Sequence, residues 1–239
     1  MIYTRFTPAV FLGLACLFFS VKAAKAFPQA IEKIAQDITV RLEGRSSVGT
    51  GVFVERQGKT YYILTNAHVV QQPGSYLVAT PDRKCYSIVS STINKIAGLD
   101  LAVIPLTSAL SYRVAQLGNS DKLTPGQNVY VSGWTYVGDV LRSLVFFGSQ
   151  GEITEINSKL SQGYSITYNN LIRAGMSGGG ILDEQGRLVG INGLVRYAAS
   201  NSDTIVASGI GINQFLRWRS TLKKPLSPPL TQPLSCPRK

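Results

Sequence analysis

Residues 61–70 read Tyr-Tyr-Ile-Leu-Thr-Asn-Ala-His-Val-Val and contain the only histidine of the chain, His68. The first five are aromatic or β-branched apart from one leucine, which is typical of a short strand. The histidine therefore follows directly on a strand end. Short runs of the same kind, separated by glycine and polar turns, continue on both sides, so the sequence predicts an all-β fold.

The predicted strands fall into two series that are separated by residues 106–125, a stretch without sustained periodicity. Besides 61–65, the strands are expected at 39–43, 49–54, 76–80, 87–93 and 101–105, and then at 128–132, 144–147, 151–156, 164–168, 180–182, 188–191 and 205–208. This pattern predicts two packed six-stranded β-barrels, one over about 38–106 and one over about 126–211.

Two short helices flank the barrels. Ile31, Ile34, Ala35 and Ile38 recur at helical spacing, which predicts an amphipathic helix near the start of the mature chain. Apolar residues between 212 and 222 predict a second, terminal helix.

Composition narrows the class of protein. The chain has 239 residues, of which 44% are hydrophobic and 15% are charged, and this excludes a disordered chain. Three cysteines exclude a disulfide scaffold. A single histidine excludes zinc sites that need two or three imidazoles, so no metal and no cofactor are expected.

Residues 1–26 are typical of a secretory signal peptide. Arg5 precedes an uncharged, mostly apolar stretch at 6–21, and a small-x-small cleavage site occupies 24–26. A weaker cleavage site lies at 21–23. The alternative, a membrane anchor, needs about 20 apolar residues, and this stretch is shorter. Export to the periplasm or the extracellular space is expected, where Cys85 and Cys236 would either pair or remain free thiols.

The positive charge gathers at the C-terminal end. Without residues 1–26 the net charge is +8, and residues 217–239 carry +6 of it with no acidic residue. The preceding domain is nearly neutral, so nucleic-acid binding is not expected. Five prolines after residue 224 predict an extended, solvated tail over 223–239. That tail is either inert or a weak electrostatic tether to an anionic membrane or cell-wall surface.

Three residues suggest nucleophilic catalysis. His68 follows a strand, Asp100 begins an apolar strand, and Ser177 lies in the glycine-rich segment 175–180. A serine hydroxyl needs a base to remove its proton, imidazole titrates near neutrality, and a carboxylate fixes the imidazole tautomer. Glycines allow backbone N–H groups to converge on one oxyanion. His, Asp, Ser is also a known order of the catalytic triad.

The segments 65–68, 100–103 and 175–179 resemble the motifs of trypsin-like serine proteases of the chymotrypsin fold. The flanking segments 49–54, 63–70 and 186–192 are most similar to the bacterial HtrA/Deg branch, and the resemblance spans about residues 36–218. It implies that His68 is the general base, Asp100 its orienting carboxylate and Ser177 the nucleophile. The N–H groups of Gly175 and Ser177 would form the oxyanion hole.

The sequence departs from that branch in three respects. A Pro-rich tail follows residue 222 where HtrA proteins usually carry a PDZ domain, so the predicted domains are a leader (1–26), a protease domain (27–222) and the tail. Trimer assembly and PDZ-driven activation therefore do not carry over, and the oligomeric state is left open. Arg173-Ala174 stands where HtrA members usually have Asn-Pro. The predicted mature start does not have an Ile-Val-Gly-Gly-type sequence, so activation by insertion of a cleaved amino terminus is not expected.

In the resembling family the base of the specificity pocket lies six residues before the serine, at Leu171 here. An apolar base leaves a cationic side chain without a counter-ion, which disfavours cleavage after Lys or Arg. Cleavage after Glu, with Arg173 or Arg196 as the counter-ion, is the alternative. The sequence as a whole predicts a secreted or periplasmic serine endopeptidase acting on proteins or peptides. The alternatives are a non-catalytic binding module on the same fold and a surface-tethered interaction protein.

Overall fold

The computed structural model describes residues 27–138, 143–156, 161–197, 205–223, 226, 231 and 233–236. The predicted signal peptide at 1–26 lies outside them, as do the side chain of Arg196 and parts of the tail. Within the described ranges, no helix is both long enough and apolar enough to cross a bilayer.

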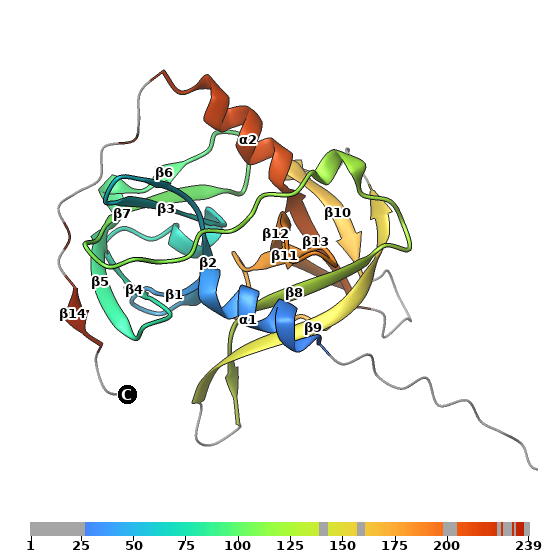
Figure 1. Ribbon diagram of the computed structural model, residues 1–239, viewed down its shortest axis with the longest axis horizontal. Coiled ribbons are helices and arrows are strands. Elements are labelled where there is room, and N and C mark those ends of the chain that lie inside the picture. Colours follow the sequence, from blue (N-terminus) through green and yellow to red (C-terminus); the bar gives the residue numbers. More distant parts are fainter. Residues whose placement is uncertain are drawn as a thin grey trace, which may run out of the picture.

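Seven strands from the first half of the chain and one from its C-terminal end form an antiparallel sheet of eight strands, in the order β14-β5-β4-β1-β2-β3-β7-β6 (Figure 1). Its strands are β1 (Thr39–Glu43), β2 (Val48–Gln57), β3 (Thr60–Thr65), β4 (Ser75–Ala79), β5 (Lys84–Val89), β6 (Asn94–Lys95), β7 (Ala102–Thr107) and β14 (Leu234–Ser235). The short 3₁₀ turns η1 (His68–Val70) and η2 (Ser90–Thr92) connect strands within it.

This sheet corrects the prediction of a closed first barrel with six strands. Its two edge strands do not pair with each other. β6 has only two residues and pairs with β7, and the free edge of β5 is taken by β14 from the C-terminal end of the chain. An edge strand exposes unpaired N–H and C=O groups. In a closed barrel the opposite edge strand would pair with them, but here β14 pairs with part of the β5 edge.

The second half forms the predicted closed barrel of six strands, in the order β10-β13-β12-β11-β8-β9 (Figure 1). Its strands are β8 (Asn128–Val137), β9 (Ser143–Ile156), β10 (Tyr164–Tyr168), β11 (Gly180–Leu182), β12 (Leu188–Tyr197) and β13 (Ile205–Gly211). The 3₁₀ turns η3 (Ser120–Lys122) and η4 (Ser161–Gly163) precede β8 and β10. β9 runs unbroken through the two segments predicted at 144–147 and 151–156.

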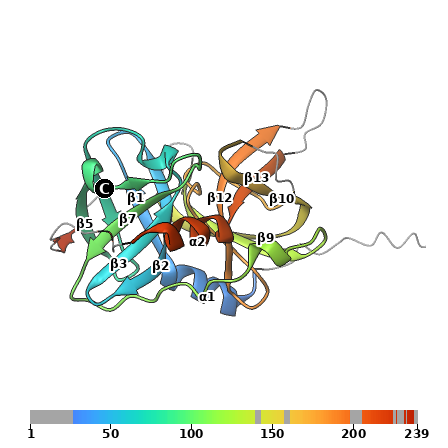
Figure 2. The same cartoon turned by 90° about the horizontal axis from the view of Figure 1, so that it is seen from above.

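Both predicted helices are present, as α1 (Gln29–Ile38) and α2 (Ile212–Thr221). α1 buries Ile31, Ala35 and Ile38, three of the four positions whose spacing predicted it, and the fourth, Ile34, is half-buried. α2 lies across the junction of the two halves (Figure 2) and buries Phe215 there.

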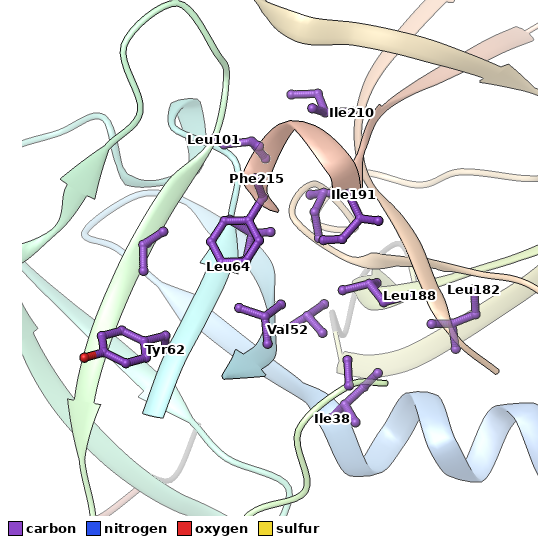
Figure 3. Packing of buried hydrophobic residues seen from close by; sticks show 14 of the residues in the cluster. Ile38, Val52, Tyr62, Leu64, Leu101, Leu182, Leu188, Ile191, Ile210 and Phe215 are labelled. Carbon is purple, nitrogen blue, oxygen red and sulfur yellow. The ribbon is translucent and has the colours of Figure 1, made fainter. Parts of the chain in front are cut away.

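One hydrophobic cluster joins the two halves (Figure 3). It combines Ile38 of α1 with Val52 and Leu64 of the first sheet and with Leu188 and Ile191 of the barrel, all at most 1% exposed. Burial of such side chains contributes about 1.5–3 kcal/mol each, so the two halves are held in one fixed relation. A site composed of residues from both halves is therefore preorganised.

The described C-terminal residues lie along the first sheet instead of forming a separate arm, although residues 233–235 remain exposed. The described residues 226, 231 and 233–236 form a strap along the first sheet. The Tyr62 hydroxyl donates to the Leu226 carbonyl at 3.1 Å, and Thr231 exchanges hydrogen bonds with the backbone of Thr107. β14 then pairs with β5, and Cys236 is joined to Cys85 by a disulfide with a Cα–Cα distance of 5.0 Å.

Two of the six tail-region charges are also engaged in ion pairs. Arg219 contacts Glu55 at 2.8 Å and Arg217 contacts Asp121 at 3.3 Å. The weak electrostatic tether to an anionic surface stays a prediction. Lys223 is described and exposed, and Lys224, Arg238 and Lys239 lie outside the described residues.

The disulfide is expected to stabilise the fold strongly, because its partners are 151 residues apart. In the chain-entropy account such a crosslink contributes roughly 2–5 kcal/mol to the free energy of unfolding. In a protein beginning at residue 27, reductant should lower the urea midpoint of the wild type but not that of Cys236→Ser. Equal wild-type midpoints with and without reductant would contradict the prediction.

Candidate active site

His68 is placed by the end of β3 and the turn that follows it. Val69 and Val70 are buried and anchor η1. The Thr65 hydroxyl donates to the Thr50 carbonyl at 2.6 Å, and the fully buried Asn66 amide donates to the Asp100 carbonyl at 3.0 Å. The backbone around His68 is thus fixed, while 43% of its side chain is accessible to solvent.

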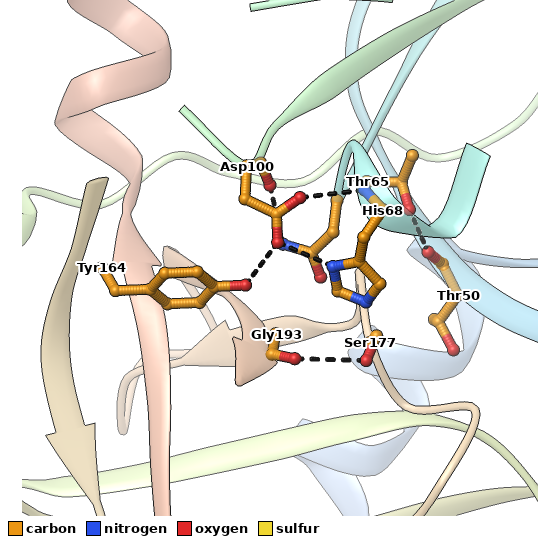
Figure 4. Close-up of polar contacts among 8 residues, drawn as sticks. Thr50, Thr65, His68, Asp100, Tyr164, Ser177 and Gly193 are labelled. Atoms are coloured by element: carbon orange, nitrogen blue, oxygen red, sulfur yellow. Dashed lines mark hydrogen bonds and ion pairs between the residues drawn. The ribbon is translucent and has the colours of Figure 1, made fainter. Parts of the chain in front are cut away.

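Asp100 receives hydrogen bonds on both carboxylate oxygens (Figure 4). The Nδ1 atom of His68 lies 2.6 Å from Oδ2, and the backbone N–H of His68 donates to Oδ1 at 2.9 Å. A carboxylate only accepts, so the Nδ1 atom carries the proton in this pair. The Nε2 atom is left unprotonated in the neutral ring, and it is the atom that can act as a base.

The charge of Asp100 is stabilised despite its burial. Burial by itself raises the pKa of a carboxyl group, but the hydrogen bonds from His68 and Tyr164 outweigh it, so the pKa of Asp100 is lowered. The opposite holds for Tyr164. Burial, the hydrogen bond to Asp100 and the negative charge of Asp100 all raise the pKa of its hydroxyl. The pair is therefore a carboxylate and a neutral phenol at neutral pH.

Ser177 lies in a tight turn between β10 and β11. Gly175 and Gly178 have φ of +96° and +86°, a region that favours glycine. A Cβ atom on Gly178 would lie 2.0 Å from the Thr50 carbonyl oxygen and 2.2 Å from the Thr65 hydroxyl. The residue next to the serine therefore packs against the strand end that carries His68, and the three predicted triad residues are brought to one place.

The Ser177 hydroxyl donates to the carbonyl of Gly193 at 3.3 Å (Figure 4). Within the part of the chain that the structure describes, no hydrogen bond joins it to His68. Catalytic hydrogen bonds are often long or misaligned before a substrate binds. Rotation about the Cα–Cβ bond would redirect the hydroxyl from Gly193.

Two backbone N–H groups of the turn lack a hydrogen-bond partner in the described part of the chain. The Met176 N–H donates to the Arg173 carbonyl and the Gly179 N–H to the Met176 carbonyl, whereas the N–H groups of Gly175 and Ser177 have no partner among the described residues. These are the two groups predicted to bind an oxyanion. The position of Gly175 is fixed from the first sheet, because the Thr50 hydroxyl donates to its carbonyl at 2.8 Å.

The predicted pocket residue Leu171 lies at the surface, with 51% of the residue exposed. The base of a closed pocket would be largely buried, so Leu171 does not form one in this structure. Arg173 stacks on Phe147, with its guanidinium carbon 4.7 Å from the ring centroid. The structure places neither side chain inside a described cavity.

Four residues of the site were not predicted from the sequence: Thr50, Asn66, Tyr164 and Gly193. Thr50 and Asn66 stand within the motifs that flank the triad residues, so their position in those segments was an available signal. Tyr164 opens an ordinary strand, and no local pattern distinguishes it from the other tyrosines of the chain.

Comparison with known proteins assigns a family to residues 49–191, which match the model of the trypsin-like peptidase domain. A serine protease HtrA-like of Staphylococcus aureus (strain USA300) is 29% identical over 159 residues, covering 62% of this chain and 20% of its own length. The serine protease Do-like HtrA of Bacillus subtilis (strain 168) is 28% identical over 157 residues, covering 62% of this chain and 34% of its own. The chain thus spans about a fifth of the length of the first of these curated relatives and about a third of the second.

Among solved structures, the HtrA-type protease AlgW with a tripeptide superimposes with a TM-score of 0.62 at 23% identity, covering 80% of this chain and 62% of its own. A variant of AlgW with a decapeptide superimposes with a TM-score of 0.61 at 19% identity, covering 80% of this chain and 65% of its own. At these identities the similarity shows a shared fold, which is chymotrypsin-like.

Proposed function

This chain belongs to the trypsin-like peptidase domain family, and from that premise we propose that it is an exported serine endopeptidase. The observation that carries the proposal is the His68–Asp100 contact of 2.6 Å at the place where the glycine turn presents Ser177. Asp100 is a buried, ionised carboxylate that is hydrogen-bonded to His68. Ser177 lies beside them, next to the N–H groups of Gly175 and Ser177. This arrangement supports acyl transfer.

In the proposed reaction the Ser177 Oγ atom attacks the carbonyl carbon of a peptide bond while its proton passes to Nε2 of His68. The oxyanion that forms accepts hydrogen bonds from the N–H groups of Gly175 and Ser177. The imidazolium, stabilised by Asp100, returns the proton to the leaving amine as the C–N bond breaks. Water then attacks the acyl-enzyme by the same base catalysis and releases the carboxylic acid.

Peptides are the proposed substrates. The superimposed AlgW structures hold a tripeptide and a decapeptide, which supports a peptide ligand for the shared fold. The Cys85–Cys236 disulfide supports export, because structural disulfides form and persist in oxidising compartments.

A fluorophosphonate probe tests the proposal, because it reacts covalently with an activated serine. We expect the purified protein beginning at residue 27 to gain one adduct, located on Ser177 by peptide mass spectrometry, and Ser177→Ala to gain none. A wild type that stays unlabelled under conditions where it is folded would support a non-catalytic binding module instead.

Leu171 is expected to favour small or medium apolar residues, such as Val, Ala or Leu, before the scissile bond. The exposed leucine offers apolar contact and no counter-ion, so a Lys or Arg side chain held against it would gain no ion pair. The cleavage profile of a peptide library measures this. A profile dominated by Lys and Arg would contradict the prediction. A profile dominated by Glu would indicate that an arginine, Arg173 or Arg196, contacts the residue before the scissile bond.

A further inference from the structure

Asp100 has a third hydrogen-bond donor, from the other half of the molecule. The hydroxyl of Tyr164, the first residue of β10, donates to Oδ2 at 2.5 Å (Figure 4). Oδ2 is also the oxygen that faces Nδ1 of His68. The tyrosine and the imidazole therefore share one carboxylate oxygen, so a change at the phenol acts directly on the atom that orients the base.

Both partners are withdrawn from water. Tyr164 is 3% exposed and Asp100 is 6% exposed. An ionised carboxylate that loses water must recover its hydrogen bonds within the protein. Two of its three donors belong to His68, and the phenol supplies the third. Its raised pKa keeps it a protonated donor across the pH range in which the enzyme would work.

The position of the phenol is set by close packing around Gly193. A Cβ atom at Gly193 would lie 2.4 Å from the Tyr164 hydroxyl and 2.8 Å from the Asn66 amide nitrogen. The carbonyl of the same glycine accepts the hydrogen bond from Ser177. Gly193 thus lies between the Tyr164 hydroxyl and Ser177. Any side chain at position 193 would clash with the Tyr164 hydroxyl in its observed position.

We propose that Tyr164 is a positioning residue of the active site, which holds Asp100 ionised and aligned so that His68 keeps its proton on Nδ1. The proposal rests on the proposed function. The titratable groups that face Asp100 are His68 from η1 and Tyr164 from β10, and Tyr168 faces Tyr164 from farther along the same strand.

Tyr164→Phe removes this donor and preserves the ring. Without it the carboxylate charge is balanced by fewer donors and attracts a second proton on the imidazole more strongly, so on acidification the base that must accept the serine proton is lost at a higher pH. We expect the acidic limb of the pH profile of fluorophosphonate inactivation to move upward by about one unit. The inactivation rate at pH 7 should fall about tenfold.

Tyr86→Phe is the matched control. Tyr86 is equally buried, and its hydroxyl bonds Ser108 and Tyr112 in the core of the first sheet. Both variants lose a buried phenol, so both should lose thermal stability, but only Tyr164→Phe should move the acidic limb. An unmoved limb in a folded, Ser177-dependent Tyr164→Phe enzyme overturns the proposal.

A second readout needs no activity. His68 is the only histidine, so a protein without a histidine tag has a single imidazole to follow by NMR. The Nδ1 proton resonance of His68 should shift in Tyr164→Phe and stay in place in Tyr86→Phe. If the wild type fails to react with the probe, the proposed function fails, and this resonance still decides the positioning role. An identical resonance in Tyr164→Phe and wild type overturns it.

Discussion

Replacing Ser177 with alanine should lower the hydrolysis of labelled casein by about 10⁵-fold or more. Without the hydroxyl there is no acyl-enzyme, and only binding and the backbone N–H groups remain to assist attack by water. A loss of this size corresponds to roughly 7 kcal/mol in the activation barrier. Purified protein beginning at residue 27 would be assayed at neutral pH.

His68→Ala should cost about as much, and the double variant with Ser177→Ala little more than either alone, because the triad acts as a unit. Ser108→Ala provides the control. Ser108 is a buried serine bonded to Tyr86 in the first sheet, away from the glycine turn. That variant should keep its turnover. Full activity in Ser177→Ala would rule out the proposed mechanism.

Asp100→Asn should lower turnover by about 10⁴-fold while leaving the fold in place. The amide that replaces Oδ2 can donate to Nδ1 of His68, which favours the tautomer with its proton on Nε2. In that tautomer the imidazole cannot accept the serine proton. The hydroxyl of Tyr164 would also lose its charged acceptor.

Asp183→Asn is the matched control for Asp100→Asn. Asp183 is 2% exposed and accepts from the Arg187 guanidinium at 2.7 Å and from two backbone N–H groups. The exchange should reduce stability without removing activity. Turnover of Asp100→Asn within tenfold of the wild type would show that Asp100 does not set the tautomer of His68.

The parts of the site that were predicted from the sequence are those that local chemistry determines. His68 follows a strand, and Ser177 requires glycines around it, so short segments indicate both roles. α1 was predicted because one face of it meets the core. The strand series also predicted the closed second barrel, but the same reasoning wrongly predicted a closed first one, because closure depends on long-range pairing.

The parts that were not predicted depend on long-range contacts. Tyr164 meets a carboxylate 64 residues away in the other half, and no pattern near Tyr164 indicates this. β14 lies in a Pro-rich stretch that favours an extended chain, and only the open edge of β5 makes it a strand. The pairing of Cys85 with Cys236 depends on a Cα–Cα distance that the sequence does not contain.

The disulfide of the strap also determines whether the chain stays in one piece after its backbone is cleaved. The Cys85–Cys236 bond encloses Asp100, Ser177 and the whole barrel, while His68 lies on the segment before Cys85. A protease that cuts its own backbone once, anywhere between the two cysteines, therefore still consists of one covalent molecule that carries His68, Asp100 and Ser177. On an electrophoresis gel such a nicked enzyme would run as a single species until a reductant separates its fragments. A single self-cleavage would therefore go undetected on a gel run without reductant, whereas a second cut between the cysteines would release the segment between the two cuts.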